Sequence, residues 1–184
     1  MRHRITLPIA LLLVVTAAGS AQSVSVGALK DSSWVSYLLV HPLHEIHATS
    51  REVKFTAVLD TAARRLSGLT AAVDVLSFDS GNSNRDSHAG EVVDAISYPM
   101  VAFTSTRVIA HGDSIAVAGT LNFHGVTKPV TAEGTAVWSG RELSVQGGFN
   151  ISLTEFQIDR PSLLMVPVQD TLRFTVHAVF PLGR

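Results

Sequence analysis

Apolar and polar residues alternate along most of the chain after residue 30, and a period of two is typical of β-strands with one buried face. The clearest row lies near the C-terminus, where Leu172, Phe174, Val176, Ala178 and Phe180 alternate with Arg173, Thr175 and His177. Comparable rows predict further strands over residues 34–40, 52–59, 69–75, 101–108, 115–123, 130–138 and 143–151. About eight evenly spaced strands with one apolar face predict an all-β fold, an antiparallel meander closed into a barrel.

One segment breaks this alternation, and we expect it to form a single short helix over residues 85–96. Asn84 is a suitable N-cap, and Asp86 suits the first helical turn. His88, Val92 and Ile96 follow one another at a spacing of four and would share one face of this helix.

Several glycines interrupt the predicted strands, namely Gly119, Gly134, Gly147 and Gly148. Glycine weakens a strand, and it is expected where a sheet bends sharply or where another group packs close to the backbone. Both explanations suit a curved barrel.

The N-terminus has the pattern of a secretory signal peptide. Arg2 and Arg4 precede an apolar core at residues 5–15, which is too short to span a bilayer, and small residues follow up to Ala21. We therefore expect residues 1–21 to be removed near Ala21. Residues 22–184 would then form one β-barrel domain, located in the periplasm or secreted.

Composition narrows the function classes. The chain has no cysteine, so a protein exported to an oxidising compartment would rely on neither disulfides nor thiol chemistry. It carries 14 basic and 15 acidic residues without a basic stripe, which argues against nucleic acid as a partner. No later apolar run is long enough for a membrane-spanning helix, so no stable membrane anchor is expected.

Two segments each begin as a strand and break into a polar turn. The first, at residues 77–88, reads Ser-Phe-Asp-Ser-Gly-Asn-Ser-Asn-Arg-Asp-Ser-His, and the second, at residues 119–129, reads Gly-Thr-Leu-Asn-Phe-His-Gly-Val-Thr-Lys-Pro. Together they resemble the signature of the YceI-like family, which has Arg-Asp-x-His in the first segment and His-Gly-Val-Thr-Lys-Pro in the second. The resemblance extends over about residues 33–180.

The resemblance implies a secreted, lipocalin-like β-barrel that encloses one long amphiphile without catalysis or cofactor. A polyisoprenoid or isoprenoid quinone is the favoured ligand, with a fatty acid or fatty amide next. A membrane or a redox protein would then act as donor or acceptor. Val92 and Val93 stand where relatives often carry paired aromatics, and Phe123 replaces a smaller residue, so ligand size can differ here.

The apolar interior is the first candidate site. An eight-stranded barrel is just wide enough to fill itself with side chains or to hold one slim ligand, and the residues alone leave both open. For a hollow barrel, the candidate lining residues are Phe103, Leu121, Phe123, Phe149 and Phe174. A slip of one residue in register would turn any of them outward.

The polar segments are the second candidate. Arg85, His88 and His124 could form a polar end that meets a ligand head group, with Lys128 beside Arg85 for a phosphate. Alternatively, Asp86 caps backbone amides, and the polar residues form a hydrogen-bond network that ties a helix-bearing loop to the barrel. The second interpretation is favoured because turns need such partners in any case.

A different class of function is suggested by His41, His44 and His47, which could make a periplasmic metal-binding or redox-accessory protein. Residues three apart face opposite sides of a strand, so a loop or short turn is favoured at this segment. Catalysis is not expected, because no Gly-x-Ser-x-Gly elbow is present. The apolar residues near Leu163 could form a lid over one barrel end or a plug within it.

Overall fold

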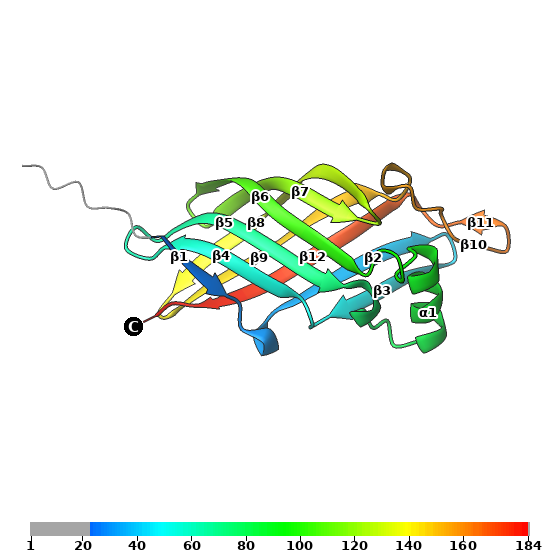
Figure 1. Cartoon of the computed structure of the whole chain (residues 1–184), viewed down its shortest axis with the longest axis horizontal. Coiled ribbons are helices and arrows are strands. Elements are labelled where there is room, and N and C mark those ends of the chain that lie inside the picture. The colour runs from blue at the N-terminus through cyan, green and yellow to red at the C-terminus, as the bar shows by residue number, and fades with distance from the viewer. Residues whose placement is uncertain (1–22, 184) are drawn as a thin grey trace, which may run out of the picture.

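A computed structural model describes residues 23–183, and strands account for most of them (Figure 1). Ten strands form one antiparallel sheet in the order β1-β4-β5-β6-β7-β8-β9-β12-β2-β3. The strands are β1 (Ser23–Gly27), β2 (Trp34–His41), β3 (His44–Ser50), β4 (Lys54–Asp60), β5 (Arg65–Asp74), β6 (Met100–His111), β7 (Ser114–Phe123), β8 (Val126–Ser139), β9 (Glu142–Ser152) and β12 (Thr171–Pro181).

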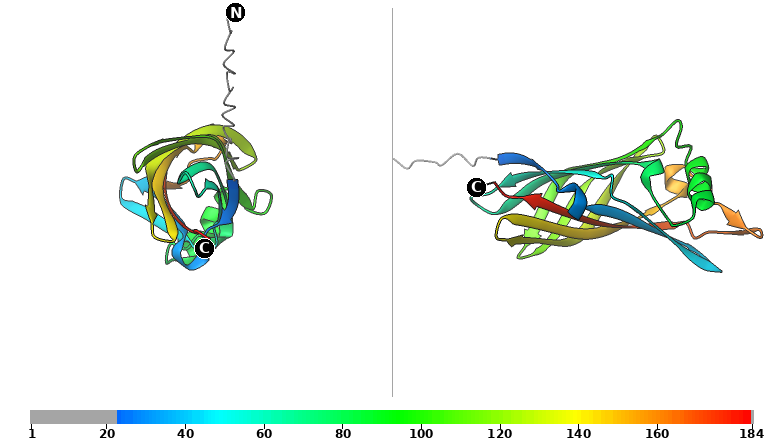
Figure 2. Two further views of the ribbon diagram at one scale, coloured as in Figure 1. Left: turned by 90° about the vertical axis from the view of Figure 1, so that its left-hand side faces the viewer. Right: turned by 90° about the horizontal axis from the view of Figure 1, so that it is seen from below.

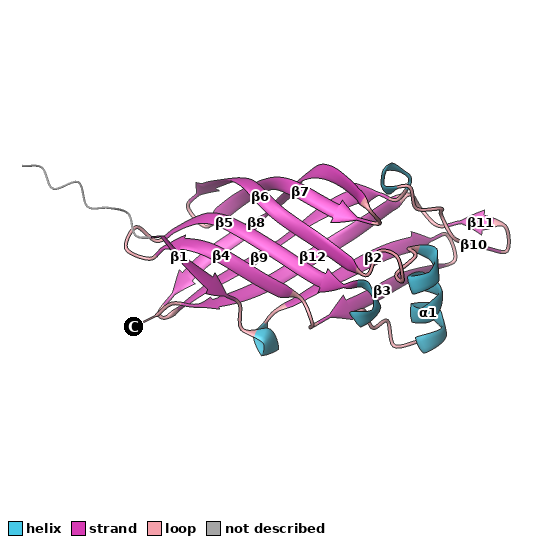
Figure 3. Cartoon of the chain, viewed as in Figure 1, coloured by secondary structure: helices cyan, strands magenta, loops and turns pink. Residues whose placement is uncertain are grey.

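The remaining elements are short. They are the helix α1 (Ser83–Val92), the 3₁₀ turns η1 (Lys30–Ser32), η2 (Val75–Ser77) and η3 (Thr154–Phe156), and a two-stranded sheet of β10 (Ser162–Leu163) and β11 (Val166–Pro167). No helix among residues 23–183 is long and apolar enough to cross a membrane. Figure 3 shows how far strands outweigh helices.

The sheet curls into an elongated barrel, which confirms the predicted fold class (Figure 2). Near the end that holds the C-terminus, the segment after β1 reaches β12. The backbone N–H of Leu29 donates to the carbonyl of Val179 at 2.7 Å, and the N–H of Val179 donates to the hydroxyl of Ser33 at 3.1 Å. Helix α1 and the β10–β11 hairpin lie at the opposite end (Figure 1).

All eight predicted strands are present, but the count of eight was too low. The prediction missed β1, which is only five residues long, and β3, which carries three ionisable residues in its first four positions. The prediction of a loop or short turn at residues 41–47 holds only for the turn at Pro42 and Leu43, because the residues on both sides of it belong to strands β2 and β3. His41 ends β2 and pairs directly with His44 across a two-residue turn.

The predicted helix exists with different bounds. The side chain of Asn82, rather than that of Asn84, caps α1 by accepting the N–H of Arg85 at 3.1 Å. The helix ends at Val92 because Asp94 adopts a left-handed φ of 44°, a common way to terminate a helix. Ile96 lies beyond this point and is 95% exposed, so it does not share the face that the spacing suggested.

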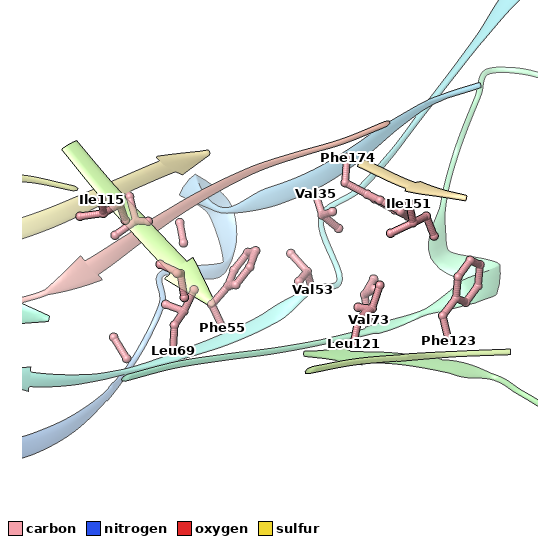
Figure 4. Close-up of a cluster of buried hydrophobic side chains, with 14 of the residues drawn as sticks. Val35, Val53, Phe55, Leu69, Val73, Ile115, Leu121, Phe123, Ile151 and Phe174 are labelled. Carbon is pink, nitrogen blue, oxygen red and sulfur yellow. The ribbon is translucent and has the colours of Figure 1, made fainter. Parts of the chain in front are cut away.

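The interior at the end of the barrel that holds the C-terminus is filled. Leu59, Leu143 and Phe180 are completely buried there. Figure 4 shows further apolar side chains converging from several strands, among them Phe55 and Leu69.

The strand glycines mark close approaches, as expected. A Cβ added to Gly119 would lie 2.6 Å from Cζ of Phe103, so the Phe103 ring covers this glycine. Gly134 and Gly147 are cross-strand partners, and a Cβ on Gly134 would lie 2.5 Å from Cα of Gly147. The backbones of β8 and β9 therefore crowd together at this point, where any side chain would meet main-chain atoms.

Candidate functional site

A cavity of about 510 Å³ opens at the α1 end of the barrel. Its volume lies in the range of roughly 300–1,000 Å³ that is typical of small-molecule sites. Most of its lining is apolar and includes Tyr37, Leu39, Ile46, Phe78, Val92, Val93, Val101, Phe123, Leu153, Ile158, Leu163, Leu172 and Phe174. Most of the polar lining comes from α1 and its preceding loop, and His41, His44 and Ser162 add polar groups from β2, β3 and β10.

Helix α1 contributes much of this polar lining, and a network centred on Ser80 holds the helix in place. The Asp86 carboxylate accepts the backbone N–H of Ser80 at 3.2 Å and also accepts its hydroxyl. The guanidinium of Arg85 donates from Nε to the Ser80 hydroxyl at 2.8 Å and from Nη2 to the Ser80 carbonyl at 2.7 Å. Both charged side chains therefore serve to hold the loop against its own helix.

The same loop is attached to the barrel at β3. Thr49 and Asp79 exchange two backbone hydrogen bonds, of 2.9 and 3.0 Å, and the hydroxyls of Ser50 and Ser77 lie 2.7 Å apart. These contacts match the second interpretation of the polar segment, a hydrogen-bond network that ties a helix-bearing loop to the barrel. That network fixes one wall of the cavity.

The three residues proposed for the polar end are not all at the cavity. Arg85 and His88 line it, with Asn82, Asn84 and Asp86. His124 instead occupies a two-residue turn between β7 and β8, where both it and Gly125 have positive φ angles of 51° and 73°. Its Nδ1 lies 3.1 Å from the Phe156 carbonyl, and its ring packs edge-on against Tyr98. His124 thus supports the neighbouring η3 turn.

A second hollow, of about 70 Å³, lies deeper in the barrel. All five residues proposed as apolar lining face one of the two spaces. Phe123 lines the larger cavity, whereas Phe103, Leu121 and Phe149 line the smaller hollow, and Phe174 lines both. The barrel interior is therefore filled at one end and hollow at the other.

The three candidate metal ligands are separated by the β2–β3 hairpin. His41 is buried, with its Nε2 donating to the Val166 carbonyl at 2.9 Å while its Nδ1 accepts the N–H of Leu43 at 3.1 Å. His44 pairs with it on the inner face, but His47 lies on the outer face beside Glu45, at 3.3 Å. Within residues 23–183, no group of three or more His, Cys, Asp or Glu side chains is arranged to hold a metal ion.

The segment proposed as a lid or plug, residues 158–165, lies partly at the cavity and partly in solvent. Ile158 is buried and borders the cavity, as do Pro161, Ser162 and Leu163. The tip of the β10–β11 hairpin points away from the core, and Met165 is 97% exposed. The base of the segment therefore closes part of the cavity wall, and its tip does not.

Sequence reasoning missed Tyr37, whose ring lines the larger cavity. Burial raises the pKa of its phenol above the ordinary value of 10.0, and the negative charge of Asp86 adds to this effect. The phenol is therefore neutral at physiological pH. Its place in the inward row of β2, with Val35 and Leu39, was the signal that could have identified it.

Comparison of the chain with known proteins identifies a family and several relatives. The YceI-like domain family model matches residues 29–180. Protein YceI of Salmonella newport is 26% identical over 159 residues, covering 82% of this chain and 83% of its own length. A UPF0312 protein of Vibrio campbellii is 36% identical over 101 residues, but the match spans only about half of each protein, 50% of this chain and 53% of the relative.

Solved structures share the fold as well. Burkholderia cenocepacia BcnA matches with a TM-score of 0.74 and 22% identity, covering 83% of this chain and 98% of its own. A domain from Saccharophagus degradans, described as polyisoprenoid binding and implicated in plant cell wall breakdown, matches with a TM-score of 0.64 and 12% identity. That match covers 86% of this chain and 98% of the domain. With the family model spanning most of its length, the chain belongs to the YceI-like family.

Proposed function

We propose that this protein is a non-catalytic binding and carrier protein that encloses the apolar tail of one long-chain amphiphile. The observation that carries the proposal is the cavity of about 510 Å³ at the α1 end, with a mostly apolar lining and polar residues concentrated on α1. A polyisoprenoid or an isoprenoid quinone is the favoured ligand, and a fatty acid or fatty amide is next. The domain from Saccharophagus degradans, described as polyisoprenoid binding, adds support for that ligand class.

Apolar burial alone is sufficient for binding of this kind. Each buried CH₂ contributes about 0.8 kcal/mol, so a five-carbon isoprene unit contributes about 4 kcal/mol. Association costs roughly 4–15 kcal/mol in lost freedom of motion. Several units must therefore be enclosed at once, which favours an internal cavity over a surface groove.

The polar residues on α1 favour a head group other than a phosphate. Arg85 already donates to Ser80 from two of its nitrogens, and the Asp86 carboxylate lies beside it. A phosphate would have to compete for that guanidinium and would meet the negative charge of Asp86. The amides of Asn82 and Asn84 can instead bond a quinone oxygen, an alcohol or an amide.

The proposed location is the periplasm or the extracellular space, with a membrane or a redox protein as donor or acceptor. This part of the proposal depends on the signal-peptide pattern of residues 1–21, which lie outside the described residues.

Filling the cavity tests the proposal. Ala89 lines the cavity from α1, so Ala89→Trp would place an indole within it. Ser87 is exposed on the same helix and does not line the cavity, which makes Ser87→Trp the matched control. Binding would be measured with cis-parinaric acid fluorescence and competition by geranylgeraniol and palmitate.

We expect the unmodified protein and Ser87→Trp to bind one probe molecule per chain. Ala89→Trp should bind at least about ten-fold more weakly, because its indole takes the place of two or more buried CH₂ groups. Equal binding by Ala89→Trp and Ser87→Trp would show that the ligand lies elsewhere, and no binding by the unmodified protein would remove the proposal.

A further inference from the structure

Three aromatic side chains form a row across the inner face of neighbouring strands. In the sheet register, Phe174 of β12 pairs directly with Tyr37 of β2 on one side and with Phe149 of β9 on the other. The rings of Phe149 and Phe174 stack with centroids 5.0 Å apart and planes 19° apart, and Tyr37 meets Phe174 edge-on at 6.5 Å. The row therefore runs across three neighbouring strands, β2, β12 and β9.

This row lies where the two hollow spaces meet. Phe174 and Val101 are the residues that line both the cavity of about 510 Å³ and the deeper hollow of about 70 Å³. On the deeper side the Phe103 ring covers Gly119, and the crowded backbones at Gly134 and Gly147 border the hollow. The barrel thus changes from hollow to nearly filled at the level of Phe174.

The aromatic neighbours hold the Phe174 ring in this position. Phe149 stacks on one face, and Tyr37 is itself packed against Phe78, with centroids 5.3 Å apart. Phe174 is buried, so a change of rotamer would require its neighbours to move as well. The ring is a fixed surface toward the larger cavity.

We propose that Phe174 sets the length of the ligand's apolar tail by forming the floor of the binding cavity. This inference rests on the proposed function. A tail that extends toward the deeper hollow would gain affinity about four-fold per buried CH₂, equivalent to about 0.8 kcal/mol, unless something stops it. The Phe174 ring stops it, and the deeper hollow, at about 70 Å³, is far smaller than the cavity of about 510 Å³.

The test measures affinity against tail length. The probes are saturated fatty acids from decanoate to lignocerate and prenyl alcohols from geraniol to geranylfarnesol, each competing with cis-parinaric acid. For the unmodified protein, affinity should rise with tail length and then level off when the tail reaches Phe174. Phe174→Ala should move that plateau to longer tails and raise the affinity ratio of long to short probes at least about ten-fold, the gain of two or more buried CH₂ groups.

Two further variants keep the test sound. Phe174→Leu retains an apolar side chain while removing the ring, and it decides the question if the alanine variant does not fold. Phe180→Leu is the matched control, because Phe180 lies on the same strand and the same inner face, is fully buried, and lines neither hollow. It should lose stability without moving the plateau.

Three results would overturn the inference. The first is that folded Phe174 variants keep the plateau of the unmodified protein. The second is that Phe180→Leu moves the plateau as far as the Phe174 variants do, which would indicate general loosening of the barrel. If the unmodified protein binds no member of either series, the proposed function itself fails and the inference fails with it. If the protein binds the probes but the plateau is the same with and without the Phe174 ring, only the inference is refuted.

Discussion

Asp86 allows the attachment of α1 to be tested independently of any ligand. Its carboxylate accepts both the backbone N–H and the hydroxyl of Ser80, and this holds the wall of the cavity to the loop that precedes it. Asp86→Ala removes both bonds and leaves Ser80 without its acceptor. The expected effect is local detachment of α1, because the helix lies at one end of the barrel and outside the ten-stranded sheet.

The magnitude follows from the bonds that are lost. A hydrogen bond to a charged group contributes about 1.5–3 kcal/mol. Asp86 is only partly buried and its carboxylate keeps contact with water, so we expect the two bonds together to contribute no more than one such bond, and α1 docking to weaken by about 2 kcal/mol in total. Because 1.4 kcal/mol corresponds to a factor of ten, amides of α1 should exchange with solvent about 30-fold faster.

Hydrogen–deuterium exchange followed by mass spectrometry measures this directly. Peptides that cover α1 should lose protection in Asp86→Ala, and peptides from β7 and β9 should not. Glu91→Ala is the control, because Glu91 is exposed on the same helix and its ion pair with His88 spans 3.6 Å. Two results would refute the view that Asp86 holds α1 to the barrel as a unit that opens by itself: an unchanged exchange rate in α1, or an equal increase of the exchange rate throughout the sheet.

Two further predictions concern stability. Burial, together with the charge of Asp86, raises the pKa of Tyr37, so its contribution to stability is fully present below pH 10.0 and is lost as the pH rises through the raised pKa. Tyr37→Phe should therefore reduce the alkaline loss of stability in urea unfolding, and an unchanged alkaline slope would contradict this. Gly125→Ala should lower the free energy of unfolding by about 1–3 kcal/mol, since residue 125 has a φ of 73° and a Cβ there would lie 2.5 Å from Cε1 of Tyr98. A melting temperature equal to that of the unmodified protein would count against this explanation.

The limits of sequence reasoning are visible at particular residues. The period of two found the long strands because each has one buried face, but it failed at β3, where only Ile46 and Ala48 of its seven residues are apolar. The inward aromatics were found for the same reason. Their division between two hollows depends on the register that pairs Phe174 with both Tyr37 and Phe149, and register is a relation between distant strands.

The polar segments illustrate a second limit. His124 and Arg85 come from segments that belong together in the family signature, and both were candidates for one polar end. The fold places only Arg85 at the cavity, because the turn that holds His124 packs against η3. The start of α1 also differs from the predicted start. Both Asn82 and Asn84 are acceptable N-caps, and the choice between them depends on the loop anchored at Ser80.

The most direct test of the central claim is native mass spectrometry of the protein exported to a bacterial periplasm and purified gently, followed by organic extraction. We expect a discrete additional mass that extracts as an apolar isoprenoid, quinone or fatty-acid-like molecule and that is much reduced in Ala89→Trp. A clean unliganded mass that persists after incubation with prenyl alcohols and fatty acids would contradict the claim.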